Sequence, residues 1–356
     1  MDIPAPLTGI THKMVRTPRL DQHVYFSGPE DGIPVLFLHG NFAAGLYWEK
    51  TMQDLPLGYR GIAPDLRGYG WTEDKLVDST RGMREWSDDL NDLMLSLGIP
   101  RAHLVGWSMG GGVAYRFVTD YPGKTISMTL ISPVSPYGFG GTEDVTGTPC
   151  YPDFAGSGGG VVNPTFIQRI QMGDRSGDDP NSPRTVINAF YYKPPFRAGR
   201  EEDFLTASLM EKTGPEKYPG DFVPSTNWPF VGPGVKGVVN CWSPKYLAND
   251  VAEFLGVTPK PPILWVRGDS DMIVSDNSMF DLGTLGKLGY VPGWPGAEVY
   301  PPQPMIAQTR AVFDEYAKRG GTCTEIVISN AAHGAHIEKP DEFNSLFHAF
   351  LKSQKA

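Results

Sequence analysis

The chain consists of short, mainly apolar runs separated by stretches in which apolar positions recur with helical spacing. Runs of this length, bounded by turn residues, are typical of buried strands. They occupy 33–38, 102–105, 125–131 and 262–266, and residues 323–328 alternate enough to form a final strand. Two earlier segments, at 12–20 and 22–26, are predicted to open the fold as antiparallel strands. Because strands and helical patterns alternate, an α/β fold is predicted.

Amphipathic helices are predicted between the strands and at the end of the chain. At 83–97 the apolar residues fall at helical spacing, Asp88, Asp89 and Asp92 are expected on the opposite, solvated face, and Gly98 ends the helix. A helix at 111–118 follows the strand at 102–105, and another at 340–351 closes the chain.

The regular pattern breaks between residues 135 and 258, where glycine, proline and aromatic residues crowd together. This change predicts an insertion at 135–258 that divides a core into a first part, 1–134, and a second part, 259–356. A second insertion, at about 277–302, either braces the first one or contacts another subunit, and the sequence leaves both readings open.

The pentapeptide Gly106-Trp107-Ser108-Met109-Gly110 lies between a predicted strand and a predicted helix. In so tight a turn, a Cβ two residues before or after the serine would collide with neighbouring backbone, so glycine is required there. The serine hydroxyl then projects above the sheet, at a helix N-terminus that favours developing negative charge. The pattern predicts Ser108 as a nucleophile, although alone it also fits a glycine-rich turn that happens to contain serine.

Carboxylates and histidines follow two later strands, in the chain order serine, acid, histidine. Asp269 and Asp271 follow one predicted strand, and His333 and His336 follow the last one. Serine is a poor nucleophile at its own pKa, histidine accepts its proton, and a carboxylate fixes the imidazole tautomer. The three residue types together predict a Ser-His-Asp arrangement with Ser108 as the nucleophile.

These residues, with the loop His39-Gly40-Asn41-Phe42 and the phrase at 61–70, resemble the α/β-hydrolase superfamily. The resemblance implies the α/β-hydrolase fold, in which helices flank a mostly parallel central sheet and the 135–258 insertion forms a cap. It also implies that the A-P-D-x-R-G-x-G phrase at 63–70 is architectural rather than chemical.

The resemblance selects one aspartate and one histidine from the two pairs of candidates. The family's G-x-x-D spacing selects Asp271, and Asp269 is then expected to bond to its own loop. The H-x-x-H-x-E-x-P variant assigns catalysis to His333, and His336 then either packs at the pocket rim or supports the loop. Residues 131–134 contain no carboxylate, which removes the position that some relatives use and favours Asp271.

The resemblance also implies an oxyanion hole. One backbone N–H comes from Met109, the residue after the nucleophile, and the second from Asn41, with Phe42 as the alternative. The Asn41 side chain either adds a donor or closes an Asx turn. Most aromatic residues of the cap are expected to form its own core. Those expected to contact substrate, inside the cap and outside it, are Phe42, Trp107, Tyr191 and Trp228.

A serine at this position predicts attack on a carbonyl through an acyl-enzyme, hence a hydrolase for a carboxylic ester or lactone of a fairly bulky, apolar small molecule. Relatives that open epoxides or displace halide carry aspartate where Ser108 stands, so those reactions are disfavoured. Two alternatives remain: hydrolysis of a carbon–carbon bond beside a ketone, and a non-catalytic protein of this fold that binds a ligand.

Composition narrows the function classes further. The 356 residues are enough for one large core with an insertion, and a net charge of -9 disfavours nucleic-acid binding. The cysteines, Cys150, Cys241 and Cys323, fit neither a disulfide framework nor a metal site. The expectation is a cytoplasmic protein that contacts no membrane and uses no cofactor or metal; its oligomeric state is left open.

Overall fold

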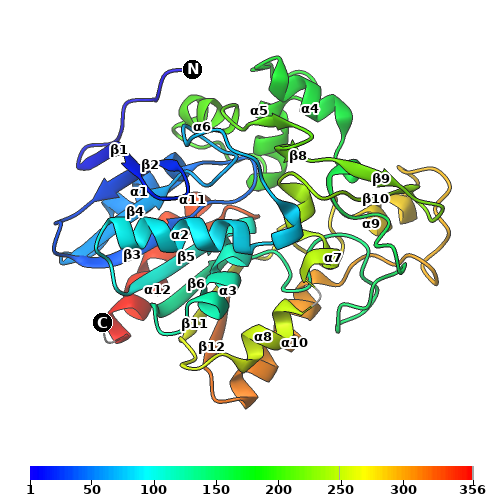
Figure 1. Cartoon of the computed structure of the whole chain (residues 1–356). Helices are drawn as coiled ribbons and strands as arrows, with labels where there is room; N and C mark the ends of the chain where they lie inside the picture. Colours follow the sequence, from blue (N-terminus) through cyan, green and yellow to red (C-terminus); the bar gives the residue numbers. More distant parts are fainter. Residues whose placement is uncertain (248, 355–356) are drawn as a thin grey trace.

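The computed structural model describes residues 1–247 and 249–354, and its centre is a single large sheet (Figure 1). Within those residues the sheet has eight strands in the order β1-β2-β4-β3-β5-β6-β11-β12. Their bounds are β1 Ile10–Arg16, β2 Asp21–Ser27, β3 Ile33–Leu38, β4 Tyr59–Pro64, β5 Ala102–Trp107, β6 Thr125–Ile131, β11 Ile263–Gly268 and β12 Cys323–Ile328.

Strand direction decides which loops of the sheet meet. β1 pairs with β2, and β2 with β4, in antiparallel fashion. From β4 onward all neighbouring strands are parallel, so the carboxyl ends of β3, β5, β11 and β12 lie at the same edge. The mostly parallel α/β sheet and its antiparallel opening are confirmed.

Helices cover both faces of the sheet (Figure 1). The helices of these layers and of the loops that join them are η1 Gly45–Trp48, α1 Glu49–Gln53, η2 Ser79–Arg81, α2 Arg84–Ser96, α3 Met109–Asp120, α8 Asp250–Gly256, α10 Met305–Lys318, α11 Ala335–Glu338 and α12 Pro340–Ser353. A further helix, α9 Leu282–Lys287, lies in the 277–302 insertion. On one face Phe254 of α8 packs against Tyr115 of α3 and Tyr316 of α10. On the other, Phe37 of β3 packs against Trp48 and Phe347. Among the described residues, no helix is both long and apolar enough to cross a bilayer.

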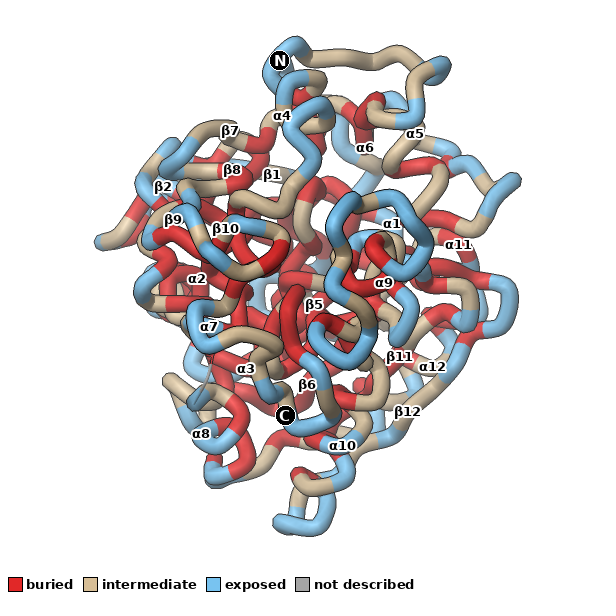
Figure 2. Tube along the Cα trace, turned by 90° about the vertical axis from the view of Figure 1, so that its right-hand side faces the viewer, coloured by how far each residue is buried: buried red, intermediate tan, exposed pale blue. Residues whose placement is uncertain are grey.

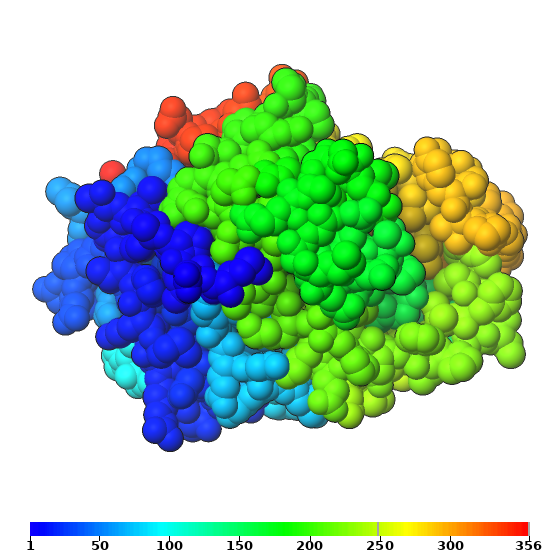
Figure 3. Space-filling view, turned by 90° about the horizontal axis from the view of Figure 1, so that it is seen from above, coloured from blue at the N-terminus to red at the C-terminus, as the bar shows by residue number. Residues whose placement is uncertain are grey.

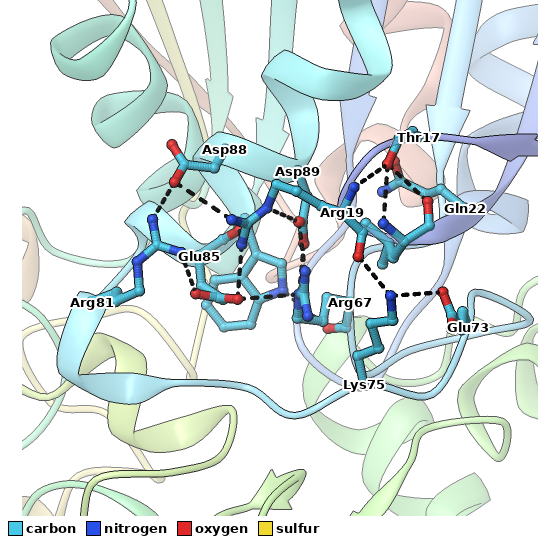
Figure 4. A network of polar contacts seen from close by, with 12 residues as sticks. Thr17, Arg19, Gln22, Arg67, Glu73, Lys75, Arg81, Glu85, Asp88 and Asp89 are labelled. Atoms are coloured by element: carbon cyan, nitrogen blue, oxygen red, sulfur yellow. Dashed lines mark hydrogen bonds and ion pairs between the residues drawn. The ribbon is translucent and has the colours of Figure 1, made fainter. Parts of the chain in front are cut away.

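Asp89 on α2 does not lie on a solvated face, and that prediction was wrong. Arg67 donates to both of its carboxylate oxygens at 2.7 Å, and Arg19 Nε donates to it at 2.6 Å (Figure 4). Because two guanidinium groups balance its charge, the Asp89 side chain is fully buried. Helical spacing alone does not distinguish a carboxylate facing water from one facing a buried arginine.

The 135–258 segment is irregular, as its composition predicted. Its elements are η3 Gly159–Val161, α4 Pro164–Gln171, α5 Pro183–Val186, the π-helix η4 Ile187–Tyr191, α6 Glu201–Ser208, β7 Thr213–Gly214, β8 Tyr218–Pro219, β9 Phe222–Pro224, β10 Val231–Pro233, η5 Val239–Trp242, α7 Pro244–Leu247 and α8. Seen from above, most of this segment lies between the N-terminal residues and the 277–302 insertion (Figure 3). Its last helix, α8, packs on α3 and α10 of the helical layer.

The 277–302 insertion contacts the 135–258 segment. Trp228 Nε1 donates to Pro292 O at 3.0 Å, and its ring meets Tyr300 edge-on at 4.9 Å between centroids. Tyr300 in turn donates from its hydroxyl to Gly156 O at 3.1 Å. The sequence left two roles open for this insertion, bracing the 135–258 segment or contacting another subunit. These contacts support bracing.

Candidate active site

Ser108 sits in a strained turn between β5 and α3. Its backbone has φ 57° and ψ −119°, values that a residue with a side chain rarely adopts. A Cβ on Gly106 would lie 2.5 Å from Gly110 O, so the flanking glycines are needed for the chain to pass itself. The turn is held by bonds to β6 and to the loop after it, because Ser108 N donates to Ile131 O and Val134 N donates to Ser108 O.

Asp271 and His333 form a buried pair at the carboxyl ends of β11 and β12. His333 Nδ1 lies 2.9 Å from Asp271 Oδ2, and both side chains are almost wholly shielded from solvent. The other carboxylate oxygen of Asp271 accepts from the amides of Ile273 and Val274 at 2.8 and 3.0 Å. The carboxylate is therefore fixed in orientation, and it favours the imidazole tautomer that carries hydrogen on Nδ1 and leaves Nε2 free to accept a proton.

Asp269 and His336, the competing candidates, have different surroundings. Asp269 accepts from the hydroxyls of Ser270 and Ser329 and from Asn330 N, so it ties two loops together. His336 stacks on Trp48 at 4.6 Å between ring centroids. Neither of its ring nitrogens has a hydrogen-bond partner among the described residues. Burial lowers the pKa of His336 to about 3, so the ring is neutral.

Trp107 connects the serine turn to the histidine loop. Its indole Nε1 donates to His333 O at 2.9 Å, and its ring lies 5.5 Å from the imidazole between centroids. The hydrogen bonds found among the described residues include the Asp271–His333 contact but none from Ser108 Oγ to His333. In enzymes without substrate this contact is often long and shortens only in the reacting complex.

The loop after β3 passes directly beside Ser108. A Cβ on Gly40 would lie 3.0 Å from the Ser108 Cβ, so glycine permits the close approach. Among the described residues the backbone N–H groups of Asn41, Phe42 and Met109 donate to no acceptor, so both candidate donors of the loop after β3 are free. Met109 is also the first residue of α3, where amides lack partners within the helix. Free donors therefore lie on both segments that adjoin Ser108.

The Asn41 side chain is engaged by a tyrosine rather than by its own loop. Tyr69 donates from its hydroxyl to Asn41 Oδ1 at 2.8 Å and also lies 3.2 Å from Met109 Sδ. Asn41 Oδ1 therefore does not close an Asx turn. Tyr69 belongs to the 63–70 motif, which the resemblance assigned to architecture. The tyrosine hydroxyl contacts one residue on each of the two segments that carry the free amides.

The four residues expected to contact substrate separate into two places. Phe42 packs on Phe166 of α4 at 5.0 Å, and Tyr191 lies edge-on to Trp107 at 5.3 Å. These contacts gather Phe42, Trp107 and Tyr191 around the serine turn. Trp228 instead packs against the 277–302 insertion.

Glu338 is a further residue of the site that the sequence signalled only as part of a motif. Its two carboxylate oxygens accept from Ala332 N at 2.6 Å and from Lys193 N at 2.7 Å. One side chain thus joins the loop that carries His333 to the 135–258 segment. Burial raises the pKa of Glu338, and the two amide donors oppose the rise.

Comparisons with known proteins identify the fold family and several relatives of the chain. A family model described as alpha/beta hydrolase fold matches residues 33–157. The uncharacterized carboxylesterase nap of Bacillus subtilis is 26% identical over 181 residues, which are 48% of this chain and 59% of the relative. The 2-hydroxy-6-oxo-6-phenylhexa-2,4-dienoate hydrolase of Burkholderia cepacia is 32% identical over 114 residues, 31% of this chain and 40% of the relative. The alignments therefore span less than two thirds of either relative.

Solved structures extend the likeness to nearly the whole chain. Carboxylesterase CesB from Bacillus subtilis superposes with a TM-score of 0.59 over 98% of this chain and 93% of its own, at 15% identity. At an identity of 15%, this likeness shows a shared fold alone.

Proposed function

The chain belongs to the α/β-hydrolase superfamily, and from that premise we propose that it is a serine hydrolase of carboxylic esters or lactones. Two observations carry the proposal: Ser108 is held at φ 57°, and the neighbouring Trp107 bonds to the carbonyl of His333, which is paired with the buried Asp271. Strain at a non-glycine residue persists only where the surroundings enforce it, and it is concentrated at functional sites.

In the first step, Ser108 Oγ attacks the carbonyl carbon of the substrate while His333 Nε2 takes the hydroxyl proton. The carbonyl oxygen becomes an oxyanion. When the tetrahedral intermediate collapses, the bond to the alcohol oxygen breaks and His333 gives its proton to that oxygen. Asp271 keeps Nδ1 protonated throughout and stabilises the imidazolium that forms.

In the second step, water attacks the acyl ester on Ser108, and His333 takes one proton from that water. The bond from the acyl carbon to Ser108 Oγ then breaks, His333 returns the proton to Oγ, and the carboxylic acid leaves. For a lactone the alcohol and the acid remain one molecule.

The free amides of Asn41 and Met109 support the assignment of an oxyanion hole. They would meet charge that exists only in the transition state, and each such donor typically contributes about two to three orders of magnitude in kcat. The bond from Tyr69 to Asn41 Oδ1 supports a fixed position for that loop.

The aromatic surroundings support a fairly bulky, apolar substrate. Tyr191 lies edge-on to Trp107, the residue before Ser108, and Phe42, in the loop that passes beside Ser108, packs on Phe166 of the 135–258 segment.

Hydrolysis of a carbon–carbon bond beside a ketone is a second candidate. The likeness to the dienoate hydrolase of Burkholderia cepacia favours it, because the same three residues serve both reactions. A panel of short and medium acyl nitrophenyl esters, lactones and a vinylogous diketone separates the two. Turnover of the esters or lactones supports the proposal, and cleavage of the diketone alone overturns it.

A fluorophosphonate probe tests whether Ser108 is an activated nucleophile. Labelling of the native protein that disappears in Ser108→Ala supports a serine hydrolase. A native protein that takes no label, with the Ser108→Ala variant equally folded by circular dichroism, supports the reading as a ligand-binding protein without catalysis.

A further inference from the structure

Glu211 is a buried carboxyl group without a partner. It follows α6, is 5% exposed, and neither of its carboxyl oxygens has a hydrogen-bond partner among the described residues. Buried polar groups in native proteins are nearly always paired, because an unpaired one costs the free energy of its lost hydration. A group that lacks a partner here is therefore a candidate for a ligand contact.

The backbone places Glu211 between two loops of the active site. Glu211 N donates to Ser208 O, and Ser208 Oγ donates to Phe42 O at 2.8 Å. The next residue, Lys212, donates from its backbone N to Gly68 O at 2.9 Å. Glu211 therefore lies where the loop that carries Asn41 meets the loop that carries Tyr69.

Three buried tyrosines lie on segments that meet here. Tyr69 follows Gly68, whose carbonyl accepts from Lys212 N, and Tyr218 N donates to Lys212 O at 2.9 Å. Tyr191 donates from its hydroxyl to Phe42 O at 3.3 Å, the carbonyl that Ser208 Oγ also contacts. Burial raises the pKa of all three hydroxyls, and an ionised Glu211 would raise it further. Tyr69 donates to Asn41 Oδ1, and Tyr191 donates to Asn41 O. The hydroxyl oxygens of these two tyrosines keep lone pairs that can accept from a ligand.

No cation balances Glu211 among the described ion pairs. The adjacent ammonium of Lys212 donates to Gly70 O at 2.8 Å and to Met210 O at 3.2 Å. Burial raises the pKa of Glu211 well above its usual range, and because no described cation offsets the cost of a buried charge, the neutral form is favoured. A protonated carboxyl group is both a donor and an acceptor, and it pairs well with a neutral oxygen-bearing group.

We propose that Glu211 and the hydroxyls of Tyr69, Tyr191 and Tyr218 form a polar subsite for a neutral oxygen-bearing group of the substrate. The group is a hydroxyl, ether or ketone oxygen additional to the ester that Ser108 attacks. This inference rests on the proposed function and deepens it: the substrate is largely apolar but carries one further oxygen that the enzyme recognises.

The test compares matched esters in the native protein, in Glu211→Gln and in Glu211→Leu. One series varies the acyl chain: p-nitrophenyl hexanoate, 3-hydroxyhexanoate, 5-oxohexanoate and 6-aminohexanoate. The other series varies the alcohol and consists of butyl butanoate and 2-methoxyethyl butanoate. Hydrolysis of these two esters is measured from the acid that is released. The measured quantity is the ratio of kcat/KM for each substituted ester to its unsubstituted parent. Glu298→Gln, at an exposed position of the 277–302 insertion, is the matched control.

In at least one series, the native ratio for an oxygenated ester is expected to exceed one by about tenfold, the contribution of one hydrogen bond. Glu211→Leu should bring that ratio close to one, Glu211→Gln should retain most of it, and Glu298→Gln should leave it at the native value. Preference for the amino ester, lost equally in Gln and Leu, would overturn the neutral subsite in favour of a carboxylate that binds ammonium.

Two further outcomes keep the failure of this inference distinct from failure of the proposed function. Ester turnover with ratios near one in both series, unchanged in Glu211→Leu, overturns the subsite and leaves the serine hydrolase intact. Absence of all ester turnover and of fluorophosphonate labelling overturns the proposed function itself. Thermal unfolding gives a second readout: removal of an unpaired buried carboxyl should raise Tm in Glu211→Leu, whereas a structural role would lower it.

Discussion

Tyr191 donates a hydrogen bond of 2.5 Å from its hydroxyl to the carbonyl oxygen of Asn41. The same residue accepts from Gly334 N through its backbone oxygen at 2.7 Å. Tyr191 ends the π-helix η4, an arrangement often found at functional sites. One residue of the 135–258 segment thus holds both the loop of the proposed oxyanion hole and the loop that carries His333.

Tyr191→Phe should therefore lower kcat by about tenfold with little change in KM, because the bond orients a donor that acts on the transition state. Steady-state kinetics with a nitrophenyl ester measure the change. Tyr192→Phe is the matched control: it is equally buried and adjacent, and its hydroxyl has no partner among the described residues. Equal losses in both variants would show that Tyr191 acts only through packing.

Asp271→Asn should lower kcat by about four orders of magnitude while the protein stays folded, because an amide at this position favours the wrong imidazole tautomer. Asp269→Asn, which alters only a loop contact, should retain turnover within a few-fold. Turnover of both variants measures the loss of activity, and circular dichroism checks that both are folded. A loss confined to Asp269→Asn would reverse the assignment of the acid.

The residues with a local chemical signature could be predicted from sequence. Ser108 stands between glycines that the turn requires, Asp271 follows the buried strand β11, and His333 follows the edge strand β12. Strands β3, β6 and β12 also agree with their predicted bounds. β4 was not predicted, because Gly61 and Pro64 have low strand propensity, and pairing with β2 and β3 overrides it.

The parts that depend on irregular segments could not be predicted. Glu211, Tyr218 and Tyr69 come from segments without periodicity, and only the folded chain brings them together. Asp89 had a helical pattern, but its partners Arg67 and Arg19 lie far from it in sequence. Trp228 was chosen as an aromatic residue of the cap, and composition does not reveal which aromatic residues face the serine.

Gly106→Ala should destabilise the fold by roughly 2–4 kcal/mol, as do changes that force a steric clash at a constrained backbone position. The added methyl would meet Gly110 O at 2.5 Å, and backbone atoms cannot move aside as a flexible side chain can. Gly199→Ala is the control, since its new Cβ would meet no atom within 4 Å. Denaturant unfolding measures both, and equal stability in the two variants would contradict this account of the turn.

His336 provides a prediction for pH dependence. Its folded-state pKa is lowered to about 3 by burial, while the unfolded chain titrates near the ordinary value of 6.5. Between these values the unfolded state binds the extra proton, so this residue lowers stability progressively as pH falls below about 6.5. His336→Phe should therefore lose less stability than the native protein when unfolding at pH 7 and pH 5 is compared.

The same variant separates His336 from catalysis. Because a neutral His336 stacks on Trp48 and has no described hydrogen-bond partner, His336→Phe should retain ester turnover within about tenfold, whereas His333→Phe should lose several orders of magnitude. Kinetics at pH 7.5, with folding checked by near-ultraviolet circular dichroism, measure the difference. Comparable loss in the two folded variants would place His336 in the proton transfer and refute its role as a packing residue.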